Sequence, residues 1–241
     1  MSRAATVLLV RHGNTADTGI RLTGWSPGVA LNELGHAQAT HLAERLADVE
    51  LTAIVSSPLQ RCRETAEAIG AAQSSAAQSS AVRPTVELDP GVGECDYGDW
   101  TGRELRELVT EPEWRLVQDH PSAARFPGGE SLAETSHRAV RAVRGHINRL
   151  HQTWAHPTVL VCSHGDVIKA IVADAMGLHL DLFQRIQVDP CSLSAIRYTT
   201  TRPFLLRVND TGGTVTDLIA HPGDVSTDAT VGGGAGSSEA T

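Results

Sequence analysis

Two histidines and two arginines stand out in this sequence because each follows a short run of branched apolar residues. The histidines are His12 and His164, each followed by glycine, and the arginines are Arg11 and Arg61. The preceding runs are ATVLLV (5–10), LTAIVSS (51–57) and TVLVCS (158–163). A guanidinium fork contacts two phosphate oxygens at once, a neutral imidazole is a nucleophile, and glycine lets the backbone approach a ligand closely. These residue types suit chemistry on an anion.

Runs of this composition are typical of strands buried in a parallel sheet. TVELD (85–89) predicts a fourth such strand, and SLSAIRY (192–198) with PFLLRV (203–208) predicts a late hairpin. Amphipathic stretches predict helices at 33–47 after Asn32, 58–69 up to Gly70, 131–152 and 166–176. We therefore predict the α/β class, with three α/β/α layers and a mostly parallel central sheet. Ligands bind beyond the carboxyl ends of such strands, where the two histidines and two arginines meet.

The chain of 241 residues predicts one domain over 1–221 and a disordered tail over 222–241. Residues 90–130 are irregular and rich in proline, which indicates a small lid insertion above the site. AAQSSAAQSSA (71–81) reads as a flexible loop. The run VGGGAG (231–236) lacks the flanking strand and helix of a phosphate-binding loop, so we interpret it as a linker.

The net charge of −8 and the pI near 5.7 argue against a general nucleic-acid or membrane-surface binder. Any bound anion must be held by a few placed cations, and these are almost all arginines, because Lys169 is the only lysine. No stretch is long enough for a signal-peptide core or a membrane span. The four cysteines show no CxxC or zinc spacing, so we expect reduced thiols, a cytoplasmic protein, no metal and no cofactor.

Several motifs occur in the order seen in the histidine phosphatase superfamily, also called phosphoglycerate mutase-like, and the chain resembles its phosphatase branch. The resemblance covers about residues 5–200. The motifs are RHGNT (11–15), LTGW (22–25), SSPLQRCRETA (56–66), GECDYGDWTG (93–102), PGGES (127–131) and SHGDVIKA (163–170). RHG alone is a weak signal, but the ordered set is specific. It implies an enzyme that hydrolyses phosphomonoesters through a phosphohistidine, without a metal ion.

The resemblance also implies a role for each matching residue. His12 matches the histidine that takes the phosphoryl group, and Glu94 matches the acid that protonates the leaving group and then activates water. The residues that match phosphate contacts are Arg11, Arg61 and His164, with lesser contacts from Asn14, Thr15, Thr23 and the backbone at Gly165. A glutamate with a raised pKa suits the acid, and His164 would be useful as a cation beside a dianion.

Each of these residues has an ordinary structural alternative. Both histidines could lie in the core, and Arg61 could be a surface residue of its helix. Asp96 and Asp99 are alternatives to Glu94 as the acid. His120, in the lid, is a further possible substrate contact.

Asp166 stands close to the expected phosphate, where the family often has an uncharged residue. It would repel a dianion unless it points to Lys169 or to the helix N-terminus. We expect Lys169 to be a surface partner of Asp166 at the i,i+3 spacing.

The main functional alternative is a cofactor-dependent phosphoglycerate mutase. In that enzyme an arginine normally follows the acid, where Cys95 stands here, and a longer insert carries a lysine and an adjacent arginine pair. Residues 103–130 contain arginines, none adjacent, and no lysine, which favours hydrolysis of a simpler monoester. A catalytically inactive binding protein is a less favoured third reading. We expect a small phosphorylated substrate, and PFLLRV (203–208) could form the apolar edge of a homodimer.

Overall fold

A mixed sheet forms the middle layer of the protein and confirms the predicted fold class. The computed structural model describes residues 3–73 and 84–212, and these form six strands in the order β3-β2-β4-β1-β5-β6. The first four in this order are parallel, and β5 and β6 form the predicted antiparallel hairpin beside β1. The strands are β1 (Ala4–Arg11), β2 (Ala53–Ser56), β3 (Val86–Leu88), β4 (Thr158–Ser163), β5 (Leu193–Thr199) and β6 (Pro203–Asp210).

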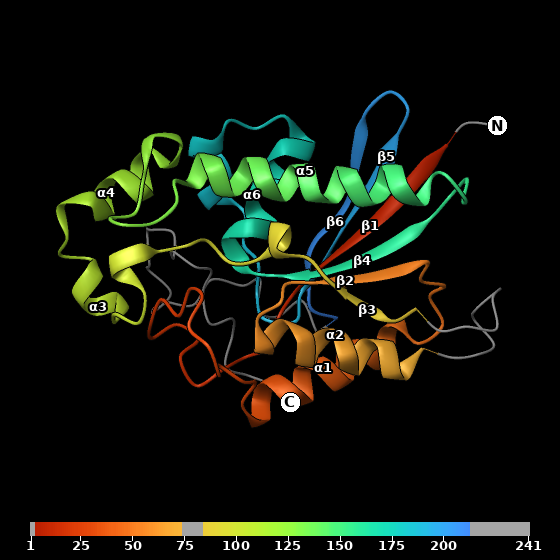
Figure 1. Cartoon of the computed structure of the whole chain (residues 1–241), viewed down its shortest axis with the longest axis horizontal. Coiled ribbons are helices and arrows are strands. Elements are labelled where there is room, and N and C mark those ends of the chain that lie inside the picture. Colours follow the sequence, from red (N-terminus) through yellow and green to blue (C-terminus); the bar gives the residue numbers. More distant parts are fainter. Residues whose placement is uncertain (1–2, 74–83, 213–241) are drawn as a thin grey trace.

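Four helices cover the two faces of the sheet (Figure 1). α1 (Glu33–Leu46) and α2 (Gln60–Ala72) pack on one face, and α5 (Leu132–Leu150) and α6 (Gly165–Met176) pack on the other. The expected Asn32 cap is present, because its side chain accepts a hydrogen bond from the Gly35 N–H. Ser131 caps α5 through a reciprocal capping box with Glu134.

The structure differs from the predicted elements in the burial of β3 and in both ends of α2. TVELD was expected to be a buried strand, but β3 lies at the edge of the sheet, and Glu87 and Leu88 are exposed. α2 begins at Gln60 instead of Pro58, because Leu59 is still extended. The helix also continues past Gly70, which packs against Ile54 on the sheet, so Ala71 and Ala72 of the predicted loop are helical.

The segment between β3 and α5 is the predicted insertion, and it is largely helical. It contains η1 (Pro90–Val92), η2 (Gly98–Trp100), α3 (Leu105–Leu108), α4 (Pro112–Asp119) and η3 (Pro121–Ala123). Figure 1 shows α3 and α4 at one end of the sandwich. The insertion has an apolar core, because Trp100 stacks on Trp114 at 6.0 Å between ring centroids and meets Phe126 edge-on. This packing holds the insertion in place beside the sheet.

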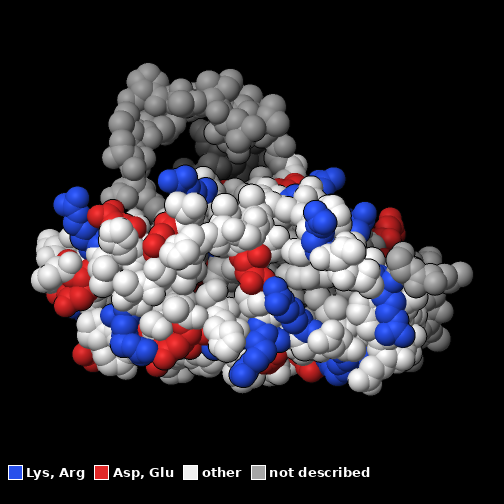
Figure 2. Space-filling view, turned by 90° about the horizontal axis from the view of Figure 1, so that it is seen from above, with Lys and Arg blue, Asp and Glu red and all other residues white. Residues whose placement is uncertain are grey.

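The loop between α6 and β5 contains one further short helix, η4 (Leu180–Arg185). Beyond it, the edge strand β6 exposes Phe204, Leu206 and Val208 at alternate positions. The homodimer expected from this stripe stays a prediction. Charges of both signs are interspersed on the face shown in Figure 2, with no continuous basic field there. Anion binding on this face would therefore rest on individually placed cations.

Several sequence predictions lie outside the described residues. These are the tail over 222–241, its VGGGAG run, and the part of AAQSSAAQSSA that begins at residue 74. Within the described residues, no helix is long and apolar enough to cross a membrane.

The chain leaving β1 touches the start of α1 backbone to backbone. A Cβ on Gly13 would lie 2.6 Å from the Gly35 carbonyl oxygen, and one on Gly35 would lie 2.0 Å from the Asn14 oxygen. The glycine after His12 was expected to admit a ligand; here it instead admits α1. This close packing fixes the direction in which the chain leaves β1.

We predict opposite stability effects for two helical Gly→Ala substitutions. Gly145→Ala, on the exposed side of α5 with nothing within 4 Å of its Cβ, should stabilise by about 0.5–1 kcal/mol. Gly35→Ala should destabilise by about 1–3 kcal/mol, because rigid backbone must move. Urea midpoints at constant m-value measure both. A stabilised Gly35→Ala protein would show that this contact yields easily.

Candidate active site

The register of the two central strands brings the two histidines together. Arg11, the last residue of β1, pairs with Ser163, the last residue of β4, so His12 and His164 leave the sheet at the same level. Their ring centroids lie 5.2 Å apart, at 62° between planes. α2 follows the neighbouring strand β2 and brings Arg61 to the same place. The structure thus gathers these four side chains at the rim that the sequence indicated.

The hydrogen bonds of His12 fix which ring nitrogen carries the proton. Nδ1 lies 2.8 Å from the Gly13 carbonyl oxygen, so Nδ1–H donates and Nε2 keeps its lone pair. The Nε–H of Arg61 donates to that Nε2 at 3.3 Å. Burial, and then the charges of Arg61 and Arg11, hold the pKa of His12 well below its usual range. Nε2 is therefore unprotonated at neutral pH, and it can act as a nucleophile once its lone pair exchanges the Arg61 hydrogen bond for an electrophile.

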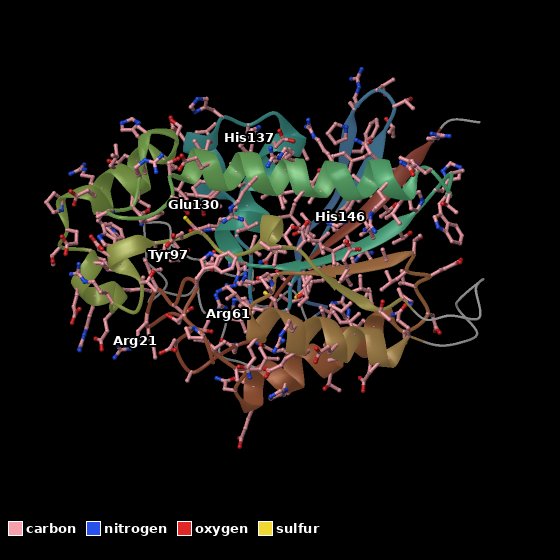
Figure 3. The ribbon with its side chains drawn as sticks, viewed as in Figure 1. Arg21, Arg61, Tyr97, Glu130, His137 and His146 are labelled. Atoms are coloured by element: carbon pink, nitrogen blue, oxygen red, sulfur yellow. The ribbon has the colours of Figure 1, made fainter. Side chains whose placement is uncertain are left out.

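Arg61, labelled in Figure 3, is buried, and its guanidinium group contacts both imidazoles. Its Nη2 donates to the Gly24 carbonyl at 2.9 Å and lies 3.4 Å from Nδ1 of His164. Its Nη1 is also buried, and it has no hydrogen-bond partner among the described residues. A buried guanidinium N–H without a partner costs free energy that an anion would recover. The alternative of a surface arginine is wrong.

Arg11 is the second buried guanidinium of the site. Its Nη1 donates to the Val188 carbonyl at 2.8 Å, in the loop before β5. Burial lowers its pKa, while Glu94, Asp189 and Asp166 oppose that change. Arginine keeps its charge even so, since the guanidinium group is the most strongly basic of the side chains.

His164 lies just before α6 and is fully buried. Its Nε2 lies 2.8 Å from Oγ of Ser57, and its Nδ1 lies 3.4 Å from Oε2 of Glu94. Burial, and then the neighbouring Arg61, hold its pKa well below the usual range. This lowered pKa favours the neutral imidazole, and the cation expected beside a phosphate dianion stays a prediction.

Glu94 lies in the insertion, in the loop between η1 and η2. It is 5% exposed, and burial raises its pKa to about 7. Asp166 adds to the rise, while Arg61, Arg11 and the Cys95 N–H bound to Oε1 at 3.0 Å oppose it. The two alternative acids, Asp96 and Asp99, are exposed and do not line the cavity beside His12. Of the three acids, the structure brings only Glu94 to the histidines.

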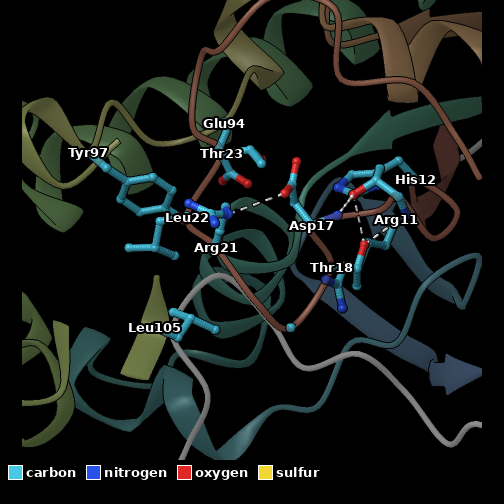
Figure 4. A pocket seen from close by; sticks show the side chains of 12 residues that line it. Arg11, His12, Asp17, Thr18, Arg21, Leu22, Thr23, Glu94, Tyr97 and Leu105 are labelled. Atoms are coloured by element: carbon cyan, nitrogen blue, oxygen red, sulfur yellow. Dashed lines mark hydrogen bonds and ion pairs between the residues drawn. The ribbon is translucent and has the colours of Figure 1, made fainter. Parts of the chain in front are cut away.

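A cavity of about 380 Å³, mouth included, opens beside His12 (Figure 4). Arg11, His12, Thr15, Thr23 and Glu94 line it as expected. Sequence reasoning did not select the other lining residues, which are Asp17, Thr18, Gly19, Arg21, Leu22, Tyr97 and Leu105. Most of them follow RHGNT within a few residues, and their closeness to this motif in the sequence could have identified them as lining residues.

Five other expected contacts do not line the cavity. Asn14 donates to Gln38 through its side chain, and Gly165 is the first residue of α6. Arg61 and His164 both contact His12, which does line it. His120 is exposed and does not line the cavity.

Asp166 does not line the cavity, and its carboxylate contacts Lys169 and Tyr97. Its Oδ1 lies 3.4 Å from Nζ of Lys169, and the Tyr97 hydroxyl donates to Oδ2 at 3.4 Å. The pairing with Lys169 was expected, but its place on the surface was wrong, because Lys169 is 3% exposed. α6 is buried at every position from Gly165 to Ala173, so its polar residues pair inside the protein.

Within the described residues, no group of three or more His, Cys, Asp and Glu side chains is placed to hold a metal ion. All four cysteines are buried thiols. Cys62 lies closest to the chemistry, with Sγ 3.4 Å from Nε2 of His164. The metal-independent activity expected from the sequence stays a prediction.

Comparisons with known proteins agree with this geometry. The model of the histidine phosphatase superfamily (branch 1) matches residues 7–211, so the chain belongs to that superfamily. It is 33% identical over 218 residues to the "Probable phosphoglycerate mutase GpmB" of Proteus mirabilis, across 88% of this chain and 94% of that protein.

Two solved structures share the fold at similar TM-scores. A mycobacterial glucosyl-3-phosphoglycerate phosphatase has a TM-score of 0.73 and 25% identity, covering 86% of this chain and 100% of its own. Bacillus stearothermophilus YhfR has a TM-score of 0.73 and 26% identity, covering 86% of this chain and 97% of its own.

We predict that ionised Glu94 destabilises the fold. Folding raises the pKa of Glu94 from 4.5 to about 7. The protonated carboxyl group therefore contributes its full stability below about pH 4.5, and this stability is lost as pH rises through about 7. The full loss is roughly 3 kcal/mol. Glu94→Gln does not titrate, so its stability advantage over wild type should grow from about pH 5 to about pH 8.

Urea denaturation at each pH measures this difference, with the exposed Asp99→Asn as the control. Parallel pH profiles for wild type and Glu94→Gln would contradict the prediction.

Proposed function

We propose that this member of the histidine phosphatase superfamily is a phosphatase that hydrolyses phosphomonoesters through a phosphohistidine on His12, without a metal ion. The arrangement around Nε2 of His12 supports this most strongly. That nitrogen is unprotonated, and it lies 3.3 Å from Nε of Arg61, whose buried Nη1 has no partner among residues 3–73 and 84–212. A neutral nucleophile beside a fixed cation with an unused donor is what phosphoryl transfer requires, since most of its catalysis is positioning and charge stabilisation.

The first step forms the covalent intermediate. The phosphate dianion lies against Arg61, Arg11 and His164, and Nε2 of His12 attacks phosphorus as the ester P–O bond breaks. Glu94 gives its proton to the departing oxygen, and the alcohol leaves. The Gly13 carbonyl, 2.8 Å from Nδ1, stabilises the positive charge that develops on the ring.

The second step returns the enzyme to its starting state. Glu94, now a carboxylate, accepts a proton from water as the water oxygen attacks phosphorus. The N–P bond breaks, its electron pair returns to Nε2, and inorganic phosphate leaves. A pKa of about 7 lets Glu94 act as acid and then as base near neutral pH.

The cavity favours hydrolysis over mutase activity. A mutase must hold a second anionic group on its substrate, and the cations that line the described cavity are Arg11 and Arg21. Arg21 is already paired, at 2.7 Å from Glu104 and 3.7 Å from Asp17. If Arg11 binds the phosphate and Arg21 keeps its ion pairs, neither of these two cations is left to bind a carboxylate of the substrate.

The mutase remains the second candidate function, because curated relatives carry that name. Two structures in the comparison are instead named phosphatases that act on glucosyl-3-phosphoglycerate and on phosphoserine.

We predict that His12→Ala leaves less than about one hundredth of the activity, because the nucleophile is lost. A quench in alkaline detergent with ³²P-labelled substrate should trap an acid-labile, base-stable phosphoprotein in wild type and none in the variant. The exposed His36→Ala serves as the control. EDTA should change neither result. Full labelling of His12→Ala would reject the covalent mechanism.

We predict that Glu94→Gln impairs substrates with poor leaving groups selectively. An alkyl phosphate expels an alkoxide that must be protonated, whereas para-nitrophenolate leaves as a stable anion. The loss in kcat/KM should be ~10²–10⁴-fold for the alkyl ester and small for the nitrophenyl ester. Equal losses on both esters would mean that Glu94 does not act as the acid.

We predict that a second anion on the substrate is unfavourable. 3-Phosphoglycerate has a carboxylate where glycerol 3-phosphate has a hydroxymethyl group, and the two are otherwise identical, so they are matched substrates. Hydrolysis of the glycerol ester should have the higher kcat/KM by about tenfold, or ~1.4 kcal/mol. If ³¹P NMR shows 2-phosphoglycerate forming faster than inorganic phosphate, the protein is a mutase.

A further inference from the structure

An arginine on another element binds three backbone carbonyls at and before Glu94. Arg138, on α5, uses all three nitrogens of its guanidinium group. Nη1 donates to the carbonyls of Gly91 at 3.1 Å and Gly93 at 2.8 Å, and Nη2 donates to the carbonyl of Glu94 at 2.7 Å. These are the backbone groups at and before the acid.

The remaining donors of Arg138 bind Glu130, from the PGGES motif. Nε meets Oε1 at 2.7 Å, and Nη2 meets Oε2 at 2.8 Å, which is a two-point ion pair. Glu130 in turn accepts from the Asp96 N–H at 3.0 Å. Arg138 and Glu130 therefore bind the backbone on both sides of Glu94, since Arg138 binds Gly93 and Glu130 binds Asp96 (Glu130 is labelled in Figure 3).

We propose that Arg138, together with Glu130, is a positioning residue that sets the place of the Glu94 carboxyl group for proton transfer. This inference rests on the proposed role of Glu94 as the acid. Neither residue lines the described cavity beside His12, so neither is placed to touch a substrate there.

The loop needs such a support because it has little regular structure. Between η1 and η2, residues 93–97 form no helix or strand, so their carbonyls need partners from elsewhere. Arg138 supplies partners to two of them, and the Trp25 indole adds a second bond to the Glu94 carbonyl at 2.6 Å. The acid must protonate an oxygen within hydrogen-bond reach, and a misplacement of about 1 Å can cost ~10²-fold in rate.

Lysine could not replace this arginine. Three backbone carbonyls and two carboxylate oxygens lie in the directions of a planar fork, whereas an ammonium group has three donors at one point. The arginine side chain is also only 19% exposed, so water replaces few of these bonds.

The test is a double-mutant cycle with Glu94→Gln, read with an alkyl phosphate and para-nitrophenyl phosphate. Arg138→Met should lower kcat/KM by ~10²-fold for the alkyl ester and by less than about tenfold for the nitrophenyl ester. In the Glu94→Gln background the same change should add little, since the acid is already absent. Arg138→Lys should show the same selectivity, and the exposed Arg141→Met, one turn along α5, should change nothing.

Glu130→Gln loosens the same bridge from its other end, so it keeps the test valid if Arg138→Met fails to fold. Circular dichroism and thermal melting establish which variants are folded. Equal losses on both esters, or a full additional loss in the Glu94→Gln background, would overturn the positioning role. If Glu94→Gln itself does not discriminate between the esters, the proposed acid fails first, which separates the two outcomes.

Discussion

The site depends on one guanidinium buried between two imidazoles. Arg61 donates to Nε2 of His12 and also lies within 3.4 Å of Nδ1 of His164. Burial, and then this cation, hold the pKa of both rings well below the usual range, and the Gly13 carbonyl holds the His12 proton on Nδ1. The sheet must therefore align β1 with β4, and β2 must deliver α2 to the same level. The parallel order of these strands meets both requirements.

The opposite charges of the site are spread over a larger part of the chain. Glu94 comes from the insertion, and Asp166 comes from the first turn of α6, where Lys169 balances it. Because Asp166 faces Lys169 and Tyr97, its negative charge raises the pKa of Glu94 without lying in the cavity. The insertion is thus part of the site: it carries Glu94, the acid of the proposed mechanism, and Arg138 of α5 binds the backbone on which Glu94 lies.

The strand ends were predictable because a buried parallel strand is a short run of apolar residues in the sequence, and a histidine–glycine pair directly after such a run is easily recognised. The edge position of β3 was not predictable, because a strand of three residues is too short for its sequence to show that it pairs on one side only. The burial of Lys169 also escaped prediction, because its spacing from Asp166 is the same on a surface helix as on a buried one. Arg138 acts across 44 residues on the Glu94 carbonyl, and such long-range contacts leave no periodic signal.

The single lysine of the chain lies inside the protein, on a helix that is buried along nine consecutive positions. Reagents directed at side-chain amines, such as acylating labels or cross-linkers, therefore have no exposed lysine to attack while α6 is packed. Any lysine labelling would measure how often α6 opens locally. The fold thus contains a chemical reporter next to its own catalytic centre, and no substitution is needed to install one.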